Sequence, residues 1–224
     1  MSVVTSVVRG TNADLIKAVV SLYGGNNPKI ADLTYGKGAF WRKTPRLRVF
    51  GSDLITCPKR PHDFTALPYR DSTFDIAVLD PPYIHSPGRH MTDERYQNRA
   101  TTKGMLWADL RRELFIPGMR EAMRIVSPQG GMVWVKCMDQ VQSGMQRWCH
   151  AELLTDAMAM GLYARDLFVL IPQSTTTSNR WNVQHHARKR HSYLWIFQRP
   201  TRKQQMQIKR EQLWTLNNTQ PPTN

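Results

Sequence analysis

The hydrophobic and polar positions along the chain form short apolar runs that alternate with stretches of helical spacing. Residues 12–23 carry apolar side chains three and four positions apart, which is the period of a helix buried on one face. Two further stretches of this kind are residues 105–126, which Pro117 is expected to kink or interrupt, and residues 144–160. The pattern therefore predicts three main helices.

Six short apolar runs between and after these helices predict β-strands. They are residues 29–33, 47–50, 74–79, 132–136, 167–171 and 192–197. Strands that alternate with helices indicate a mostly parallel sheet with helices on both faces. Only a polar segment separates the last two runs, so these two strands are expected to pair antiparallel at one edge. The predicted fold is α/β, a Rossmann-like doubly wound sheet of seven strands with its last strand antiparallel.

The length of 224 residues fits one α/β domain and leaves little room for a second. We expect this domain over residues 1–200, with basic inserts at 84–104 and 172–191, and a basic, partly disordered tail over 201–224. No apolar run approaches the roughly 20 residues that cross a bilayer, and the first nine residues do not resemble a signal peptide. Three cysteines without paired spacing are typical of reduced thiols, so a cytoplasmic protein is expected.

Net charge narrows the expected partners. The chain has 31 Lys and Arg against 17 Asp and Glu, a formal net charge of +14. An excess of this size attracts a polyanion and makes binding salt-dependent. Because the sequence contains no basic amphipathic helix with a broad apolar face, the expected partner is nucleic acid and not a membrane surface.

Directly after the apolar run 74–79 come Asp80, Pro81, Pro82 and Tyr83. They are expected at the carboxyl end of a buried strand, where open α/β sheets bind ligands. Asp80 supplies an acceptor, the prolines leave only backbone carbonyls, and Tyr83 offers a face for stacking. This set suits a planar base with an NH2 group, because two acceptors on its hydrogens favour a nitrogen with a localised lone pair. A proline-rich turn that merely ends a strand is the alternative interpretation.

After the first predicted strand, residues 32–38 read Asp-Leu-Thr-Tyr-Gly-Lys-Gly. Glycines let a backbone turn sharply and approach a ligand at a helix N-terminus. The dinucleotide-binding fingerprint needs a third glycine where Trp41 stands, and a P-loop needs glycine where Arg42 stands. Neither pattern fits, which leaves the nucleotide-binding turn of methyltransferases, with an acidic residue before its glycines.

Together these segments resemble the DNA amino-methyltransferase family, whose members methylate adenine N6 or cytosine N4. The resemblance covers residues 12–198 and implies that residues 1–200 form a class I methyltransferase domain that binds S-adenosylmethionine (AdoMet). It also implies that the catalytic residues are Asp80, Pro81, Pro82 and Tyr83. The positions that match the family's cofactor-binding residues are Asp32, Thr34, Gly36, Gly38, Asp53, Asp63 and Phe64.

The reaction that the resemblance implies is methyl transfer from AdoMet to the exocyclic amino group of a base flipped out of its duplex. Asp80 in the first motif position favours adenine N6 over cytosine N4 in the family's usual pattern. DNA is favoured over RNA as the substrate, and an RNA adenine-N6 methyltransferase is the first alternative. A catalytically silent nucleic-acid-binding subunit is the alternative from another class, and the missing third glycine disfavours a dehydrogenase.

Many members of this family carry a separate target-recognition domain, and none is recognised in this sequence. Recognition is therefore expected from the two basic inserts, where Tyr96 or Trp181 would stack on bases or fill the gap left by a flipped base. A recognition subunit or a homodimer is left open. The expected nucleic-acid-binding residues are Arg89, Arg95, Arg99, Lys103, Arg180, Arg188, Lys189 and Arg190.

No metal site is expected, because the spacing of His185, His186 and His191 fits no zinc pattern. Carbon-5 cytosine methylation needs a cysteine nucleophile after a proline, whereas Cys57 precedes one. The three cysteines are therefore expected to be packing residues.

Overall fold

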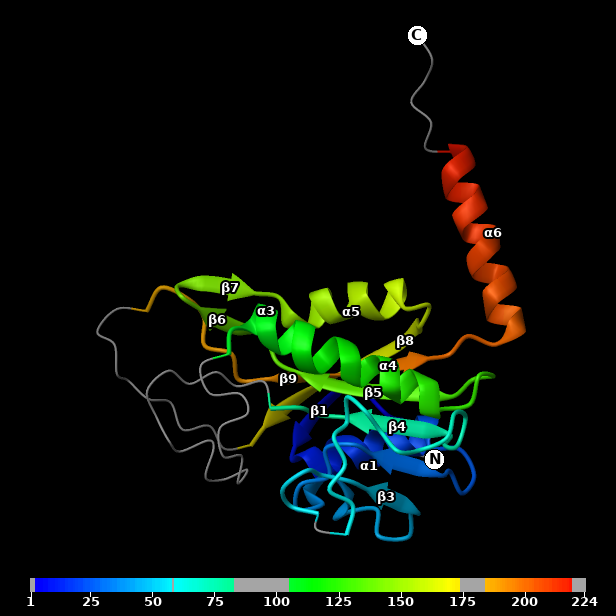
Figure 1. Cartoon of the computed structure of the whole chain (residues 1–224). Coiled ribbons are helices and arrows are strands. Elements are labelled where there is room, and N and C mark those ends of the chain that lie inside the picture. The colour runs from blue at the N-terminus through cyan, green and yellow to red at the C-terminus, as the bar shows by residue number, and fades with distance from the viewer. Residues whose placement is uncertain (1–2, 58, 83–104, 174–183, 219–224) are drawn as a thin grey trace.

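The structure is a computed structural model that describes residues 3–57, 59–82, 105–173 and 184–218, with the backbone alone over 212–218. A seven-stranded sheet forms its centre, in the order β1-β8-β9-β5-β4-β2-β3 (Figure 1). The strands are β1 (Val7–Gly10), β2 (Ile30–Asp32), β3 (Val49–Gly51), β4 (Ile76–Leu79), β5 (Met132–Cys137), β8 (Tyr163–Pro172) and β9 (Ser192–Gln198).

Strand β9 is antiparallel to both of its neighbours, β5 and β8, whereas the other pairs in the sheet are parallel. This confirms the predicted Rossmann-like sheet with its last strand antiparallel. The predicted edge position of the last two strands is wrong, because β1 pairs in parallel with β8 and forms that edge. Strand β1 was not predicted, since an edge strand of four residues with an exposed Val7 carries no clear hydrophobic pattern.

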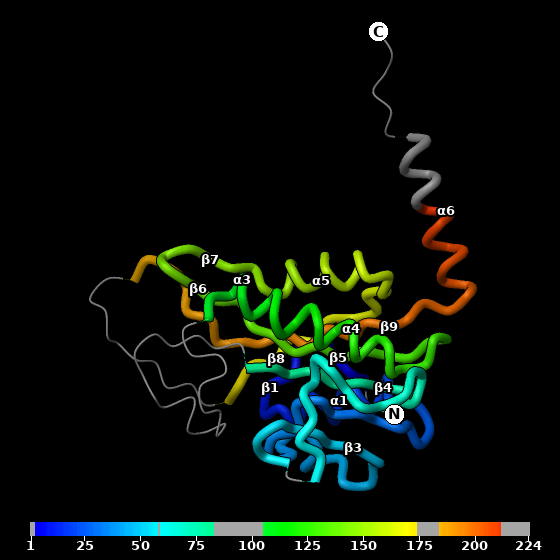
Figure 2. The backbone as a smooth tube through the Cα atoms, viewed as in Figure 1, coloured from blue at the N-terminus to red at the C-terminus, as the bar shows by residue number. Residues whose placement is uncertain are grey.

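Helices cover both faces of the sheet, as Figure 2 shows. Helix α1 (Asn12–Tyr23) lies on one face, and α4 (Ile116–Ile125) and α5 (Cys149–Ala159) lie on the other. In β4, Ile76 and Val78 pack with the α1 side, while Ala77 and Leu79 pack with the α4 side. Strand β4 is apolar at every position because both of its faces are buried.

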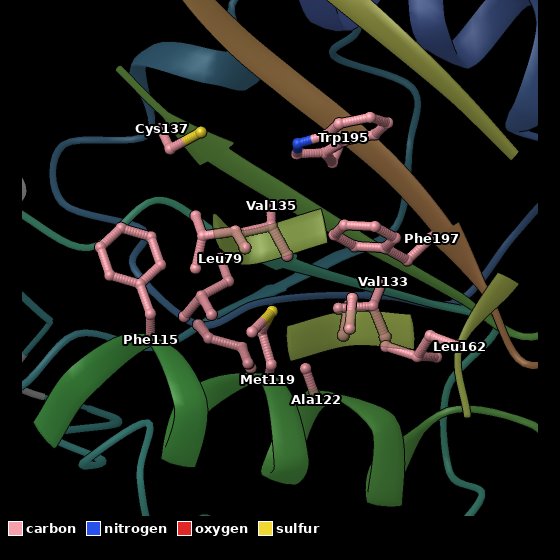
Figure 3. Packing of buried hydrophobic residues seen from close by; sticks show 14 of the residues in the cluster. Leu79, Phe115, Met119, Ala122, Val133, Val135, Cys137, Leu162, Trp195 and Phe197 are labelled. Carbon is pink, nitrogen blue, oxygen red and sulfur yellow. The ribbon is translucent and has the colours of Figure 1, made fainter. Parts of the chain in front are cut away.

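The larger hydrophobic core lies between α4 and the sheet. In Figure 3, Phe115 and Met119 project from this helical segment toward Leu79, Val133 and Val135 of the central strands. All five side chains are fully buried. This core fixes the positions of β4 and β5, and hence of the residues that follow them.

Helix α1 has the predicted bounds, because local signals at its start agree with its hydrophobic face. Thr11 caps the helix by accepting a hydrogen bond from the backbone of Asp14, whose carboxylate accepts from the backbone of Thr11 in return. Such a capping box satisfies two of the N–H groups that a helix leaves free at its N-terminus.

The helix predicted over residues 105–126 is interrupted next to Pro117, as expected. It contains α3 (Trp107–Leu110), a π-helical turn (Arg111–Phe115, element η2) and α4, in which Pro117 occupies the first turn. Pro117 has no N–H to donate to a carbonyl of the preceding turn, so the change from π to α geometry falls at this position.

The helix predicted over residues 144–160 is wrong in its first part. A hairpin of β6 (Gln140–Gln142) and β7 (Met145–Arg147) precedes α5. Its turn residues, Ser143 and Gly144, both have positive φ values, of 51° and 74°. Two successive residues of this kind form the tight turn whose twist suits a hairpin, and this turn sets the later start of α5.

A short 3-10 turn, η1 (Ala39–Trp41), and one further helix complete the described elements. Helix α6 (Arg202–Asn218) occupies most of the segment expected as a basic, partly disordered tail, and it projects away from the sheet in Figure 1. Thr201 and Gln204 cap its start by reciprocal hydrogen bonds. Among the described residues, no helix is long and apolar enough to cross a membrane.

Candidate active site

The carboxyl ends of β2, β4 and β5 meet at one edge of the sheet, because these strands are parallel neighbours. Asp32 ends β2 opposite Val78, and Leu79 at the end of β4 lies opposite Val135. Asp80 and Lys136 therefore stand side by side, one step further along the two strands. Open α/β sheets bind their ligands at such an edge.

Asp32 holds the turn that follows β2. It is 2% exposed, and its two carboxylate oxygens accept hydrogen bonds from the Thr34 backbone at 3.1 Å and from Nε1 of Trp41 at 2.6 Å. Burial raises the pKa of Asp32 to about 7, against the lowering effect of these two hydrogen bonds. In this structure both oxygens are occupied within the turn, so Asp32 contributes by shaping the turn.

The glycines of this turn allow close packing around Tyr35. Gly38 has a φ of +67°, and a Cβ atom built on it would lie 2.6 Å from the Tyr35 hydroxyl. A Cβ atom on Gly51, at the end of β3, would lie 2.3 Å from the Tyr35 ring. Gly36 has a φ of +53° and open space where a side chain would be, with only the Thr34 carbonyl oxygen as near as 4.0 Å.

Asp53 joins the glycine turn to the loop after β3. Its carboxylate accepts hydrogen bonds from the backbone of Gly36 at 3.2 Å and of Thr56 at 2.7 Å. The Thr56 hydroxyl in turn donates to the Gly36 carbonyl at 2.9 Å. The structure thus brings together five of the seven predicted cofactor-binding positions: Asp32, Thr34, Gly36, Gly38 and Asp53.

The other two predicted cofactor-binding positions lie on the next loop. Asp63 is exposed and accepts hydrogen bonds from the backbone and hydroxyl of Thr65 at 2.8 and 2.7 Å. Phe64 is half-buried and lies against Gly118 of α4, whose Cβ position would be 3.0 Å from its ring. These contacts of both side chains are with residues outside the turn that follows β2.

Thr34 connects the turn after β2 with the predicted catalytic motif. Its hydroxyl oxygen accepts a hydrogen bond from the backbone N–H of Asp80 at 2.7 Å. Pro81 is buried and Pro82 is half-buried, while Tyr83 lies outside the described residues. The position of Asp80 therefore depends directly on the turn expected to hold the cofactor.

Asp80 is half-buried and lies beside a buried lysine that sequence reasoning missed. The Oδ1 atom of Asp80 lies 3.6 Å from Nζ of Lys136, and these side chains are 19% and 6% exposed. Burial raises the pKa of Asp80, and the charge of Lys136 acts in the opposite direction. The available signal was a single lysine in the otherwise apolar strand Met-Val-Trp-Val-Lys-Cys.

The cysteines have the character of packing residues. Cys137 and Cys149 are fully buried in the core next to α5, and Cys57 is half-buried. Burial raises the pKa of Cys149 to about 12 and that of Cys137 well above its usual value. Neither of these two thiols can readily form the thiolate that a nucleophile needs.

The predicted nucleic-acid-binding residues are described only in part. Arg188 and Arg190 are exposed, and Lys189 is half-buried, in the segment before β9. The predicted residues Arg89, Arg95, Arg99, Lys103 and Arg180 lie outside the described residues, as do Tyr96 and Trp181.

Solved structures share this architecture. A Bacillus halodurans protein provisionally assigned as a methyltransferase is 12% identical, with a TM-score of 0.52 over 83% of this chain and 99% of that one. The cyclase SpnF is 15% identical, with a TM-score of 0.53 over 84% of this chain and 82% of that one. No protein-family model and no curated protein matches the chain.

A third similar structure is the 1,6-didemethyltoxoflavin-N1-methyltransferase of Burkholderia thailandensis, which contains bound S-adenosylhomocysteine. It is 13% identical, with a TM-score of 0.50 over 84% of this chain and 78% of that one. At these identities the likeness concerns the fold. The chain therefore has the Rossmann-like fold found in class I methyltransferases.

Proposed function

We propose that the chain is an AdoMet-dependent methyltransferase that acts on the exocyclic amino group of a base in DNA, with adenine N6 as the acceptor. The observation that carries this proposal is the position of Asp80. It lies half-buried at the carboxyl end of β4, and the Thr34 hydroxyl of the neighbouring turn holds its backbone. One hydrogen bond thus joins the proposed cofactor turn to the proposed base-binding motif.

The turn after β2 has features that fit AdoMet. Its glycines leave open backbone at Gly36, and Asp53 lies beside that backbone. A carboxylate there suits ribose hydroxyls, and the open space at Gly36 lets a ligand approach the backbone of the turn closely. AdoMet supplies a methyl group already activated by its sulfonium, so the transfer itself needs no metal.

The chain's own residues would prepare the base. The Asp80 carboxylate accepts one hydrogen of the amino group, and a backbone carbonyl of the proline segment accepts the other. This arrangement localises the nitrogen lone pair and aims it at the methyl carbon. The nitrogen–carbon bond forms as the carbon–sulfur bond breaks, and the nitrogen then loses one proton.

The net charge of +14 supports a polyanionic substrate. The decisive experiment is transfer of tritiated methyl from AdoMet to unmethylated DNA and to total RNA in parallel, followed by mass analysis of the nucleosides. N6-methyladenine in DNA is the expected product. N4-methylcytosine would show that the acceptor base is cytosine, and label in RNA alone would show that the substrate is RNA. AdoMet binding without transfer would indicate a silent subunit.

The variant Asp80→Ala tests the role of the motif. Because Asp80 is proposed to contact the base, methyl transfer should fall by at least about a hundredfold while AdoMet affinity, measured by calorimetry, stays near that of the wild type. The Thr34 bond is made by the backbone of Asp80, so it survives this substitution. Undiminished transfer by Asp80→Ala would contradict the mechanism.

A further inference from the structure

An exposed tryptophan lies next to the β6–β7 hairpin. Trp148 follows β7 directly and is 56% exposed, which is unusual for the largest apolar side chain. Two further apolar side chains of the hairpin, Val141 and Met145, are 40% and 58% exposed. Trp148 therefore presents apolar area to solvent, and exposed apolar surface of this kind often marks a binding site.

The basic segment 184–191 packs against the same hairpin. The His186 ring contacts the carbonyl of Gly144, at the hairpin turn, with 2.8 Å between Nε2 and O. Nζ of Lys189 lies over the Trp148 ring, 5.8 Å from its centroid. A cation from one of the predicted nucleic-acid-binding inserts is thus placed on an exposed aromatic face.

A buried carboxylate fixes the histidine ring that lies next to Trp148. Asp139 is 1% exposed, and its carboxylate binds both the backbone and the Nδ1 atom of His150, at 3.2 and 2.7 Å. The His150 ring stacks on Tyr193 with centroids 4.3 Å apart, and it lies nearly perpendicular to the Trp148 ring with centroids 6.4 Å apart. Tyr193 is fixed in turn by a 2.8 Å contact of its hydroxyl with His191.

This aromatic site lies at the same edge of the sheet as the proposed catalytic motif. Asp139 comes three residues after Lys136, whose ammonium group lies beside Asp80. In Figure 1 the hairpin lies at the end of the sheet toward which β5 runs. A strand that delivers a base to Asp80 would therefore pass close to Trp148.

We propose that Trp148 and Lys189 bind an unpaired nucleotide of the substrate strand, with its base stacked on the indole and its phosphate held by the ammonium group, which moves from the ring face to the phosphate as the base enters. An aromatic face beside a flexible cation is what single-stranded nucleic acid requires, because every base has a face to stack and a phosphate follows it. Arg188 and Arg190 add positive charge nearby. The proposal rests on the proposed function in taking nucleic acid as the ligand.

Binding is tested with the full chain and two fluorescein-labelled single strands of equal length, an oligothymidylate 12-mer and its abasic counterpart. Trp148→Ala should lower affinity for oligothymidylate about tenfold and leave affinity for the abasic strand unchanged, while Trp148→Phe restores most of it. Lys189→Ala should weaken binding of both strands and reduce the salt slope by about 0.7. Matched controls are Met158→Ala on α5 and Lys17→Ala on α1, both at exposed positions.

Equal affinity of Trp148→Ala and wild type for oligothymidylate would overturn the proposal, as would an equal loss on both strands. The test separates this site from the proposed function. Methyl transfer to DNA by wild type, combined with unchanged binding by Trp148→Ala, would contradict the nucleotide site and leave the proposed function standing. Stacking at Trp148 without any methyl transfer would keep the site and reject the enzyme.

Discussion

The half-buried Asp80 and the buried Lys136 lie side by side, and the charge of each affects the other. Burial favours the neutral acid at Asp80, while the ammonium group 3.6 Å away favours the carboxylate. The proposed reaction needs the carboxylate, since the ionised form only accepts hydrogen bonds whereas the protonated acid also donates one. Lys136 is therefore a positioning residue for Asp80 under the proposed function.

Replacing Lys136 by methionine should shift the pH dependence of methyl transfer. Without the ammonium group the pKa of Asp80 rises further, so the acid limb of the rate profile moves to higher pH and transfer at pH 7 falls about tenfold. A pH–rate profile measures this, with Lys136→Arg as the charge-conserving control. Coinciding profiles for wild type and Lys136→Met would show that Lys136 does not set the charge of Asp80.

Asp32 predicts a pH effect on stability. Its folded pKa of about 7 lies above the ordinary value of 3.8, so the folded state binds the proton more tightly than the unfolded state. The sign follows from linkage, because stability from this group is present at low pH and is lost as pH rises toward about 7. Between pH 5 and pH 8 the loss amounts to roughly 2.5 kcal/mol.

The substitution Asp32→Asn should remove this dependence, since the amide does not ionise. Urea unfolding at pH 5 and pH 8 should show the variant gaining stability relative to wild type by roughly 2.5 kcal/mol at the higher pH. A difference between the two proteins that is the same at both pH values would contradict the assignment.

At the scale of elements, the turns after β2 and β4 act as one unit through the hydroxyl of Thr34. Thr34→Val keeps the shape of the side chain but removes the acceptor for the Asp80 N–H. Under the proposed function we expect about tenfold slower transfer, with most of the activity kept in Thr34→Ser. Single-turnover rates measure the effect, and a Val variant as fast as the Ser variant would contradict it.

Elements with strong local signals could be predicted from the sequence, and elements fixed by distant contacts could not. Helix α1 has both a capping box and an apolar face, so its bounds followed directly. The hairpin turn at Ser143 and Gly144 could not be predicted, because the residues that follow it have apolar side chains at helical spacing. The pairing of Lys136 with Asp80 depends on the register of β4 and β5, which no local pattern contains.

At the scale of the whole molecule, α6 stands apart from the core. It begins after Pro200 and carries Arg202, Lys203, Lys209 and Arg210 on a helix that projects away from the sheet. The core clusters contain no residue of this helix among the described side chains. The helix therefore adds positive charge to the molecule and contributes little to the stability of the domain.

A chain that stops after Pro200 should keep its melting temperature within about 4 °C of the full chain, since a change of this size corresponds to less than about 1–2 kcal/mol. Its affinity for duplex DNA at low salt should fall, with a shallower salt dependence, because basic side chains that contact phosphates are removed. Thermal scans and a salt titration of binding measure both. Unfolding of the shortened chain would show that α6 belongs to the core.

The hydrogen bond from Asp80 to Thr34 also makes the two proposed ligands interdependent. Ordering of the turn by AdoMet would fix Asp80 for the base, so each ligand would raise the affinity for the other. Thermodynamic reciprocity requires the two enhancement factors to be equal. Cooperative binding of AdoMet and DNA, of the same size whichever is added first, is thus a consequence of a single threonine hydroxyl.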